Sequence, residues 1–546
     1  MSLIRPVGID LGTTNSVVSY ASDAGDQFHT ETVLIDGNRR SMPSVVYFGP
    51  EQTYVGRKAL NLLGQNPEYL ARSTKRYLGK GDKYRFPPAT EQFSPVGVAS
   101  EVLGTLARDA SDSLCEQVTE AVITVPADFS DAQRRLTRQA AETAGLSVVS
   151  LIAEPTAAAL AYDLREENET TVLVFDLGGG TFDASIIDIN TGLYQVNATR
   201  GDNELGGDDW TDAIVAYLKE SIEREYNVSI PSKAEDPLVN GRLWLAAEQM
   251  KTDLSSASSA STTLQYLNIG EETLPVVEVT LSHDEFEWRT EALRDQLLDH
   301  LDELFDGCSF EPSDIEEVLL VGGSTRLPQI QALTEQYFEL QPKRAKNPDE
   351  AVATGAAIQA AIIASQPALD SGSSAETNLP TTIKTGDSEL SLTETTLIDA
   401  TTRSLGVDSR DPATGTLKYV EIIPNNTSIP AEQENDTFRP FKADEGCVGA
   451  SGVRFKVYET AETDPTPDFR EKREMGEISI GNLDTSVPIE DQRITVYFRF
   501  DADNLLSVSV EEHTSGSAAT GEFEPDLGHD RDLLEAEREE LPRVYE

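Results

Sequence analysis

The sequence predicts a layered α/β domain over residues 1–365, followed by an all-β antiparallel sandwich over residues 400–515. Up to about residue 365, aliphatic strand-like runs alternate with helical stretches, a pattern typical of α/β domains. Beyond residue 400, apolar and polar residues alternate with a period of two, as in 493–500, which predicts half-buried antiparallel strands. A chain of 546 residues also exceeds the roughly 250–300 residues that one core usually serves.

Residues 366–399 separate these domains and are expected to form a linker. Ser, Thr, Gly, Pro and acidic residues dominate 366–393, a composition that favours a tether. The linker ends in Glu394-Thr-Thr-Leu-Ile-Asp399, a short and partly aliphatic segment. After the sandwich, 516–546 form a short acidic tail, so that a C-terminal helical region is at most brief.

The charge of the chain is strongly negative, at −51 from 95 acidic and 44 basic residues. Such a surface repels itself in dilute buffer, and molar salt screens it within about 3 Å, which favours a halophilic, salt-accumulating cytoplasm. An acidic mesophilic protein is the alternative. Direct nucleic-acid binding is not expected, because phosphate backbones require basic patches.

Three further features bear on the compartment. The cysteines at 115, 308 and 447 are widely spaced, so neither a disulfide framework nor a zinc site is expected. No charged-then-apolar leader opens the sequence. The longest apolar stretch, 351–364, is shorter than the roughly 20 residues that cross a bilayer. A cytoplasmic protein without membrane contact is therefore expected.

Two similar glycine-containing turns carry the main chemical signal. Asp10-Leu-Gly-Thr-Thr-Asn-Ser16 is echoed by Asp176-Leu-Gly-Gly-Gly-Thr-Phe-Asp183, and each follows an aliphatic run. In both, a strand brings a carboxylate to its end, and small residues then turn the backbone so that N–H groups and Thr hydroxyls can contact phosphate oxygens. A third glycine turn follows another apolar strand at Gly322. Two facing hairpins of this kind can hold a triphosphate.

This combination resembles the actin-like ATPase fold, and the loops narrow the resemblance to the seventy-kilodalton heat-shock family, the DnaK-type molecular chaperones. The resemblance covers residues 1 to about 515, with similar segments in order at 121–134, 154–159, 205–208 and 347–351. It implies a two-lobed ATPase with duplicated phosphate hairpins, in which 208–293 form a mobile subdomain over the adenosine. It also implies that the sandwich receives extended peptide segments.

The function implied is that of an ATP-dependent chaperone. Such an enzyme hydrolyses ATP to ADP and phosphate to control the binding and release of extended hydrophobic segments of unfolded proteins. A J-domain co-chaperone and a nucleotide-exchange factor are the further partners that the resemblance implies. Family members normally continue into a long helical lid that the 31 last residues do not supply, so faster peptide release is expected. The alternatives are a metabolite kinase on the same fold and a lidless regulatory ATPase that switches a dedicated partner.

The phosphate end of the site needs a cation, because no Walker-type loop occurs and ATP would otherwise lie among carboxylates. By resemblance, Asp10, Glu154 and Asp176 hold Mg²⁺, mostly through water. The residues that the resemblance assigns to hydrolysis are Lys75, Glu154, Asp176, Thr181 and Asp183, with K⁺ expected beside Asp183. The residues assigned to phosphate contact are Gly12, Thr13, Thr14, Asn15, Gly178, Gly179, Gly180 and Thr181. From the sequence alone, Lys75 is not preferred over Arg76.

For the adenosine, Glu248, Lys251 and Ser255 lie three and four residues apart and therefore share one helix face. A solvated helix face is the alternative interpretation of this spacing. The resemblance adds Gly322, Gly323, Ser324, Arg326 and Asp349. Many relatives stack an Arg on the base where this chain has Thr252, so weaker stacking is expected.

Two further residue sets follow from the resemblance. The set expected to couple the domains is Pro126, Arg134, Leu397, Ile398 and Asp399. The set expected to line a peptide pocket, with plain sandwich core as the alternative, is Val407, Phe438, Val453, Phe455 and Ile494. Ser150 stands where relatives often carry an Arg that supports co-chaperone contact. Arg410 and Phe441 replace smaller or more flexible residues of the arch over the peptide.

Overall fold

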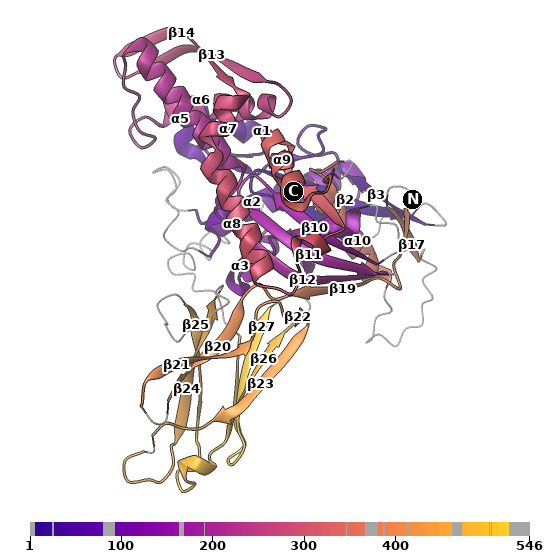
Figure 1. The fold of residues 1–546 in the computed structure, drawn as a ribbon, viewed down its shortest axis with the longest axis vertical. Helices are drawn as coiled ribbons and strands as arrows, with labels where there is room; N and C mark the ends of the chain where they lie inside the picture. The colour runs from indigo at the N-terminus through magenta and orange to yellow at the C-terminus, as the bar shows by residue number, and fades with distance from the viewer. Residues whose placement is uncertain are drawn as a thin grey trace.

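Figure 1 shows the computed structural model of the chain, in which a mixed α/β region lies above an elongated β-domain. The described residues are 6–23, 27–79, 93–162, 169–190, 192–344, 347–365, 381–385, 388–411, 414–442, 444–460, 472–501, 503 and 505–522. The expected acidic tail lies outside the described residues from 523 onward, as does the linker stretch 366–380.

The first lobe is built on a sheet with the strand order β18-β17-β3-β2-β1-β8-β9. Strands β1, β8 and β9, at one end of this sheet, are parallel. Parallel strands are usually covered on both faces and therefore consist of continuous apolar runs. Helices α2 and α3 share their apolar core. The bounds are β1 (Val7–Asp10), β2 (Asn15–Asp23), β3 (Phe28–Thr32), β8 (Glu120–Val125), β9 (Ser147–Ala153), α2 (Pro95–Leu114) and α3 (Asp131–Thr143).

A smaller three-stranded sheet, β6-β5-β7, completes this lobe. It lies between the first hairpin and α2 in the sequence and carries the 3-10 helix η2, on which Lys75 lies. The bounds are β4 (Met42–Pro43), β5 (Val45–Phe48), β6 (Thr53–Val55), α1 (Arg57–Leu60), η1 (Pro67–Tyr69), β7 (Leu70–Arg72) and η2 (Thr74–Tyr77).

The second lobe repeats the plan with the strand order β16-β15-β10-β11-β12-β19-β22. Helices α4 and α10 belong to the core that connects the two sheets. The bounds are β10 (Thr170–Leu177), β11 (Phe182–Asn190), β12 (Leu193–Asp202), β15 (Glu317–Val321), β16 (Lys343–Arg344), β19 (Thr396–Ala400), β22 (Ser428–Ile429), α4 (Glu154–Ala161), α9 (Pro328–Phe338), α10 (Ala351–Ser365), η5 (Pro312–Asp314) and η6 (Gly323–Arg326).

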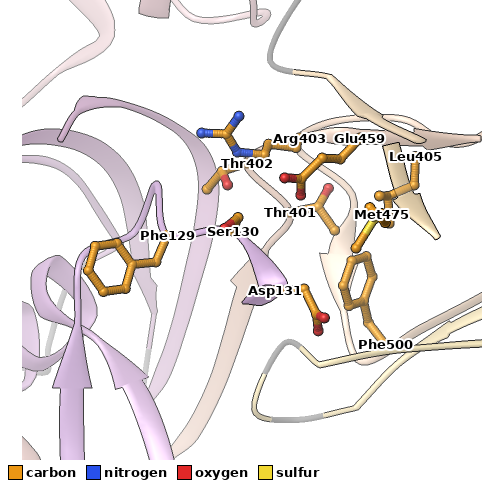
Figure 2. Close-up of a pocket in the computed structure, with 10 residues that line it drawn as sticks. All are labelled: Phe129, Ser130, Asp131, Thr401, Thr402, Arg403, Leu405, Glu459, Met475 and Phe500. Atoms are coloured by element: carbon orange, nitrogen blue, oxygen red, sulfur yellow. The ribbon is translucent and has the colours of Figure 1, made fainter. Parts of the chain in front are cut away.

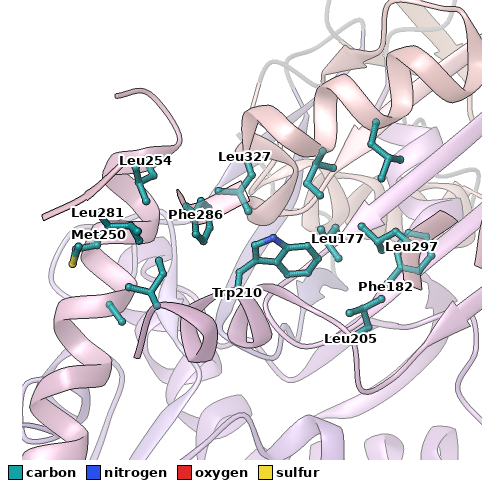
Figure 3. Close-up of a cluster of buried hydrophobic side chains, with 14 of the residues drawn as sticks. Leu177, Phe182, Leu205, Trp210, Met250, Leu254, Leu281, Phe286, Leu297 and Leu327 are labelled. Atoms are coloured by element: carbon teal, nitrogen blue, oxygen red, sulfur yellow. The ribbon is translucent and has the colours of Figure 1, made fainter. Parts of the chain in front are cut away.

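A helical subdomain with a long hairpin projects from this lobe (Figure 1). Figure 3 shows its core, where the fully buried Trp210 lies near Leu177, Phe286 and Leu327. This packing fixes the start of α5, which carries Trp210, against the second phosphate hairpin. The bounds are α5 (Gly207–Tyr226), α6 (Pro237–Leu254), β13 (Ser259–Ile269), β14 (Glu272–Ser282), α7 (His283–Arg289) and α8 (Glu291–Asp306).

The C-terminal domain packs two four-stranded antiparallel sheets face to face, with the orders β21-β20-β24-β25 and β23-β26-β27-β28. Alternate residues point into one shared core, as the period of two requires. The bounds are β20 (Ser404–Arg410), β21 (Leu417–Ile423), β23 (Ala431–Phe438), β24 (Gly452–Thr460), β25 (Arg473–Gly481), η8 (Ile489–Asp491), β26 (Ile494–Phe500), β27 (Leu506–Glu512) and β28 (Ser517–Glu522). The predicted fold class, an actin-like ATPase followed by a sandwich, is confirmed.

One segment differs from the tether expected over 366–393. Strands β17 (Thr382–Thr385) and β18 (Ser388–Ser391) form a hairpin that pairs with β3 and extends the sheet of the first lobe. Ile383 and Leu390 are buried in this hairpin. These few apolar residues are diluted by Ser and Thr, so composition alone hides their alternation.

No helix in the described ranges is long and apolar enough to cross a membrane. The helix α10, which contains the longest apolar stretch of the sequence, contacts both α4 and β1 through its small residues. Its approach to α4 is so close that a Cβ atom on Gly355 would lie 1.7 Å from the carbonyl oxygen of Ala157.

We therefore expect Gly355→Ala to destabilise the protein by about 1–3 kcal/mol, because overpacking forces α10 away from α4. The matched control is Gly104→Ala in α2, where the nearest atom to the added Cβ is 3.8 Å away. That change should be neutral or stabilise by up to about 1 kcal/mol. Urea unfolding of both variants measures the difference, and equal midpoints would contradict the packing argument.

Candidate nucleotide site

The two phosphate hairpins face each other at almost direct contact. In the second hairpin, Asp176 and Asp183 are paired across β10 and β11. A Cβ atom on Gly179 would lie 1.7 Å from Thr14 Oγ1, and one on Gly180 would lie 2.3 Å from the side chain of Thr13. Glycine is therefore required on this side of the contact, because any side chain would push the hairpins apart.

The third glycine turn joins the same place. Strand β15 runs parallel to β10 and pairs Val321 with Asp176, so the turn that follows emerges beside the second hairpin. Gly322 has a φ of 81°, and a Cβ there would lie 2.6 Å from Asp176 Oδ1. Ser324 Oγ donates a hydrogen bond of 2.8 Å to the carbonyl of Gly178. All three turns found in the sequence thus meet.

The structure distinguishes Lys75 from Arg76, which the sequence does not. Lys75 Nζ contacts Glu154 Oε1 at 2.5 Å, and the two side chains are only 6% and 9% exposed. Arg76 points instead to the carbonyl of Gly180 at 2.6 Å and to Asp209 at 2.6 Å. Lys75 is therefore the cation placed among the site carboxylates, and Arg76 joins the second hairpin to the start of α5.

The carboxylates form a site of concentrated negative charge. Burial, followed by the charge of Glu154, raises the pKa of Asp10 to about 7, against the opposing effects of Lys75 and a hydrogen bond from Thr124. Burial and Glu154 also raise the pKa values of Asp176 and Asp183 well above their usual range. One lysine does not offset these charges, so a bound cation would reduce their repulsion.

These residues fit a Mg²⁺ held through water. In the described part of the chain, no three Asp, Glu, His or Cys side chains lie close enough together to ligate a metal directly. Magnesium commonly keeps several waters and binds through one or two carboxylates and phosphate oxygens. Thr14 Oγ1 is buried between the hairpins without a hydrogen-bond partner, which suits a hydroxyl that meets a phosphate oxygen.

The residues expected at the adenosine divide into two groups. Lys251 Nζ, 2.7 Å from Glu248, also donates to the carbonyl of Gly207 at 2.9 Å and to Thr211 at 2.8 Å. Ser255 Oγ donates to its own helix, at 3.3 Å from the carbonyl of Lys251. The second group contains Arg326 and Asp349, which form an ion pair of 2.7 Å beside Gly323.

The sequence interpretation assigned no role to the start of α5, although it noted Leu205-Gly-Gly-Asp208. The N–H groups of Gly207 and Asp208 donate to the carbonyls of Gly178 and Gly179 at 3.0 and 2.7 Å. A Cβ on Gly206 would lie 2.6 Å from the backbone of Gly180. The signal was the double glycine before a helix, which marks a close backbone approach.

The five residues expected to line a peptide pocket all belong to the sandwich core or pack against it. Val407 and Ile494 are completely buried, and Val453 is partly buried. The rings of Phe438 and Phe455 lie edge to face with centroids 5.1 Å apart. The structure thus brings the set together, and its role in peptide binding stays a prediction.

The expected coupling residues lie in β19, in α3 and in the loop before α3. Strand β19 pairs Leu397 and Ile398 with β12 in parallel, so the linker end becomes part of the second lobe's sheet. Burial raises the pKa of Asp399, and the positive charge of Arg134 opposes this shift. Pro126 accepts a hydrogen bond from the N–H of Phe129 at the start of the loop before α3.

A cavity of about 20 Å³ lies at this domain boundary, lined by both domains. Figure 2 shows Ser130 and Asp131 from the first lobe opposite Arg403, Glu459 and Phe500 from the sandwich. Nearby, Ser150 Oγ donates to Asp503 at 2.9 Å. Ser150 therefore contacts the sandwich.

The fold and the site define an actin-like ATPase joined to a β-sandwich. The family model described as "Hsp70 protein" matches residues 6–540. The chain is similar to the chaperone protein DnaK of Halobacterium salinarum, with 32% identity over 97% of this chain and 76% of that protein. It is similar to the DnaK of Deinococcus deserti, with 34% identity over 95% of this chain and 79% of the relative. It is also similar to the DnaK of Mycoplasmopsis agalactiae, with 34% identity over 93% of this chain and 76% of that protein.

The chain belongs to the Hsp70 family. It is an ATP-dependent chaperone and an ATPase that uses ATP, ADP and Mg²⁺ and binds unfolded polypeptides. The resemblance drawn from the paired hairpins is confirmed, and the regulatory ATPase is not favoured.

We expect Lys75→Met to lower ATP hydrolysis by at least about 100-fold, because one positioned group that stabilises transition-state charge contributes on that order. The measurement is phosphate release at saturating Mg-ATP in molar KCl. Lys58→Ala, which changes an exposed lysine on α1, is the control and should retain the full rate. A Lys75→Met rate within threefold of the unmodified protein would contradict the assignment.

Proposed function

We propose that ATP hydrolysis between the paired hairpins controls the affinity of the sandwich for extended apolar segments, with the residue roles given below. The observation that carries the proposal is the buried Lys75–Glu154 pair among Asp10, Asp176 and Asp183, where three glycine turns meet. Phosphoryl transfer needs chiefly positioning and charge stabilisation from the protein, and this cluster supplies both.

The proposal assigns the following tasks to the polar groups of the site. Asp10, Glu154 and Asp176 hold the waters of Mg²⁺, which neutralises phosphate charge when bound. Lys75 contacts the γ-phosphate and orients the attacking water, while Thr13 and Thr181 donate their hydroxyls to phosphate oxygens. Asp183 accepts a proton from that water or holds a K⁺, in keeping with its buried position and raised pKa.

For adenosine, the proposal assigns the cluster around Lys251 and Glu248 to the ribose and the turn at 322–326 to the base. Support comes from the contact of Lys251 with the start of α5, which joins the adenosine side to the second hairpin. Thr252 is exposed and bonds its own helix at the carbonyl of Glu248. Base stacking by a planar cation is therefore not assigned to this position.

For coupling, we assign the docked strand β19 and the Arg134–Asp399 interaction. The partners proposed are a J-domain co-chaperone and a nucleotide-exchange factor, with Ser150 as part of the co-chaperone face. A cytoplasmic, salt-rich setting is proposed from the charge of −51 and the three unpaired cysteines, and one relative belongs to Halobacterium salinarum.

The proposal predicts that unfolded protein speeds hydrolysis. We expect reduced, carboxymethylated α-lactalbumin to raise phosphate release at least about threefold in molar KCl, because a coupled site responds to occupancy of the other site. Native α-lactalbumin is the control and should have no effect. A response to one dedicated partner but to no unfolded protein would favour a regulatory ATPase.

The docked linker predicts a second result. Leu397→Asp should abolish the stimulation while leaving unstimulated hydrolysis measurable, since a charge cannot pack against the apolar core that Leu397 contacts. Glu394→Gln, at an exposed position of the same segment, should behave like the unmodified chain. Full stimulation in Leu397→Asp would show that docking of β19 is not required.

A further inference from the structure

Asp128 contacts the nucleotide site and the sandwich at once. It lies in the loop between β8 and α3, and its backbone N–H donates to Asp183 Oδ1 at 3.2 Å. Its carboxylate accepts from Arg403, with the nearer oxygen at 3.1 Å and the other at 3.3 Å. Arg403 lies just before β20, so it belongs to the start of the sandwich; Figure 2 shows it opposite Phe129 and Ser130.

The surroundings leave Asp128 little freedom. Asn203 Nδ2 donates to its carboxylate at 3.1 Å. Gly201 pairs with Asp183 across β11 and β12. A Cβ on Gly201 would lie 2.5 Å from Asp183 Oδ1 and 3.1 Å from Asp128 Cβ. Because the N–H of Asp128 bonds Asp183 and Gly201 leaves no room between them, we expect a displacement of the Asp128 loop to move the Asp183 carboxylate.

The pair is also largely removed from water. The side chains of Asp128 and Arg403 are 15% and 24% exposed. Burial raises the pKa of Asp128, and the charges of Arg403 and Arg200 oppose this shift. Removing either partner while the domains stay docked would therefore leave a poorly solvated charge at the boundary.

Other contacts cross this boundary away from the site carboxylates, and Arg473 of the sandwich also donates to Ser130 Oγ in the same loop at 3.2 Å. Arg138 pairs with Asp503, to which the N–H of Leu151 also donates at 2.9 Å. The N–H of Leu506 donates to Asp131 at 2.8 Å, and the carbonyl of Leu506 accepts from Arg135 at 2.7 Å. Within the described ranges, two ion pairs cross the boundary, Arg138–Asp503 and Asp128–Arg403. Of these, only Asp128–Arg403 includes a residue that also bonds a carboxylate of the candidate site, Asp183.

We propose that Asp128 is a positioning residue through which the docked sandwich, by means of Arg403, restrains Asp183 in a slowly hydrolysing arrangement. The inference rests on the proposed function, in which unfolded protein speeds hydrolysis. Occupancy of the sandwich withdraws Arg403, the loop at 126–130 relaxes, and Asp183 becomes free to adopt its position beside the attacking water.

The test uses the full chain in molar KCl and measures single-turnover hydrolysis of ATP without unfolded protein. Small-angle X-ray scattering follows domain docking in parallel. We expect Arg403→Gln and Asp128→Asn each to raise the rate at least threefold, with ATP affinity within twofold of the unmodified chain and the scattering profile still docked. The double variant should be no faster than the faster single variant, because both changes break one interaction.

Two controls separate a restraint on Asp183 from mere adhesion of the domains. Arg138→Gln removes the other ion pair and should leave the rate within twofold while docking persists. Arg403→Lys keeps the charge and should restore a rate within twofold of the unmodified chain.

Equal rates in Arg138→Gln and Arg403→Gln would overturn the proposal, as would acceleration only in proportion to undocking. If unfolded protein fails to stimulate even the unmodified chain, the proposed function fails instead.

Discussion

The rest of the structure depends on one constraint: three glycine turns approach each other closely around buried acids, one of which, Glu154, pairs with Lys75. Gly179 and Gly180 allow the hairpins to touch Thr14 and Thr13, and Gly322 brings the third turn against Asp176. The approach concentrates charge, and Lys75 offsets only part of it. Because burial and neighbouring carboxylates raise the pKa values of Asp10 and Asp176, binding of a cation would favour their ionised form.

Much of this arrangement could be predicted, because its signals are local. An apolar strand that ends in Asp and is followed by a glycine turn can be recognised in the sequence. Because this pattern occurs twice, the sequence predicts two hairpins without any knowledge of their contacts. The spacing of Glu248 and Lys251 likewise places them on one helix face, and the structure adds their contacts with the start of α5. The alternation beyond residue 400 predicts the sandwich for the same reason.

Other features could not be predicted, because they depend on long-range contacts. Lys75 and Arg76 are neighbours, and only the fold turns one to Glu154 and the other to Asp209. The role of Asp128 depends on Arg403, which is 275 residues away in the sequence. The hairpin at 382–391 was not predicted, because it is stabilised by backbone pairing with β3 and contains few apolar residues that would indicate strands.

The hairpin at 382–391 also limits how far the two lobes can separate. Strand β18 belongs to the sheet of the first lobe and ends at Ser391, whereas β19 belongs to the sheet of the second lobe and begins at Thr396. The four intervening residues span at most about 18 Å from one strand to the next when fully extended. The connection is therefore short, so a large rotation of one lobe against the other would require a strand to detach from its sheet. Whether β18 and β19 are both paired would then report how far the cleft has opened.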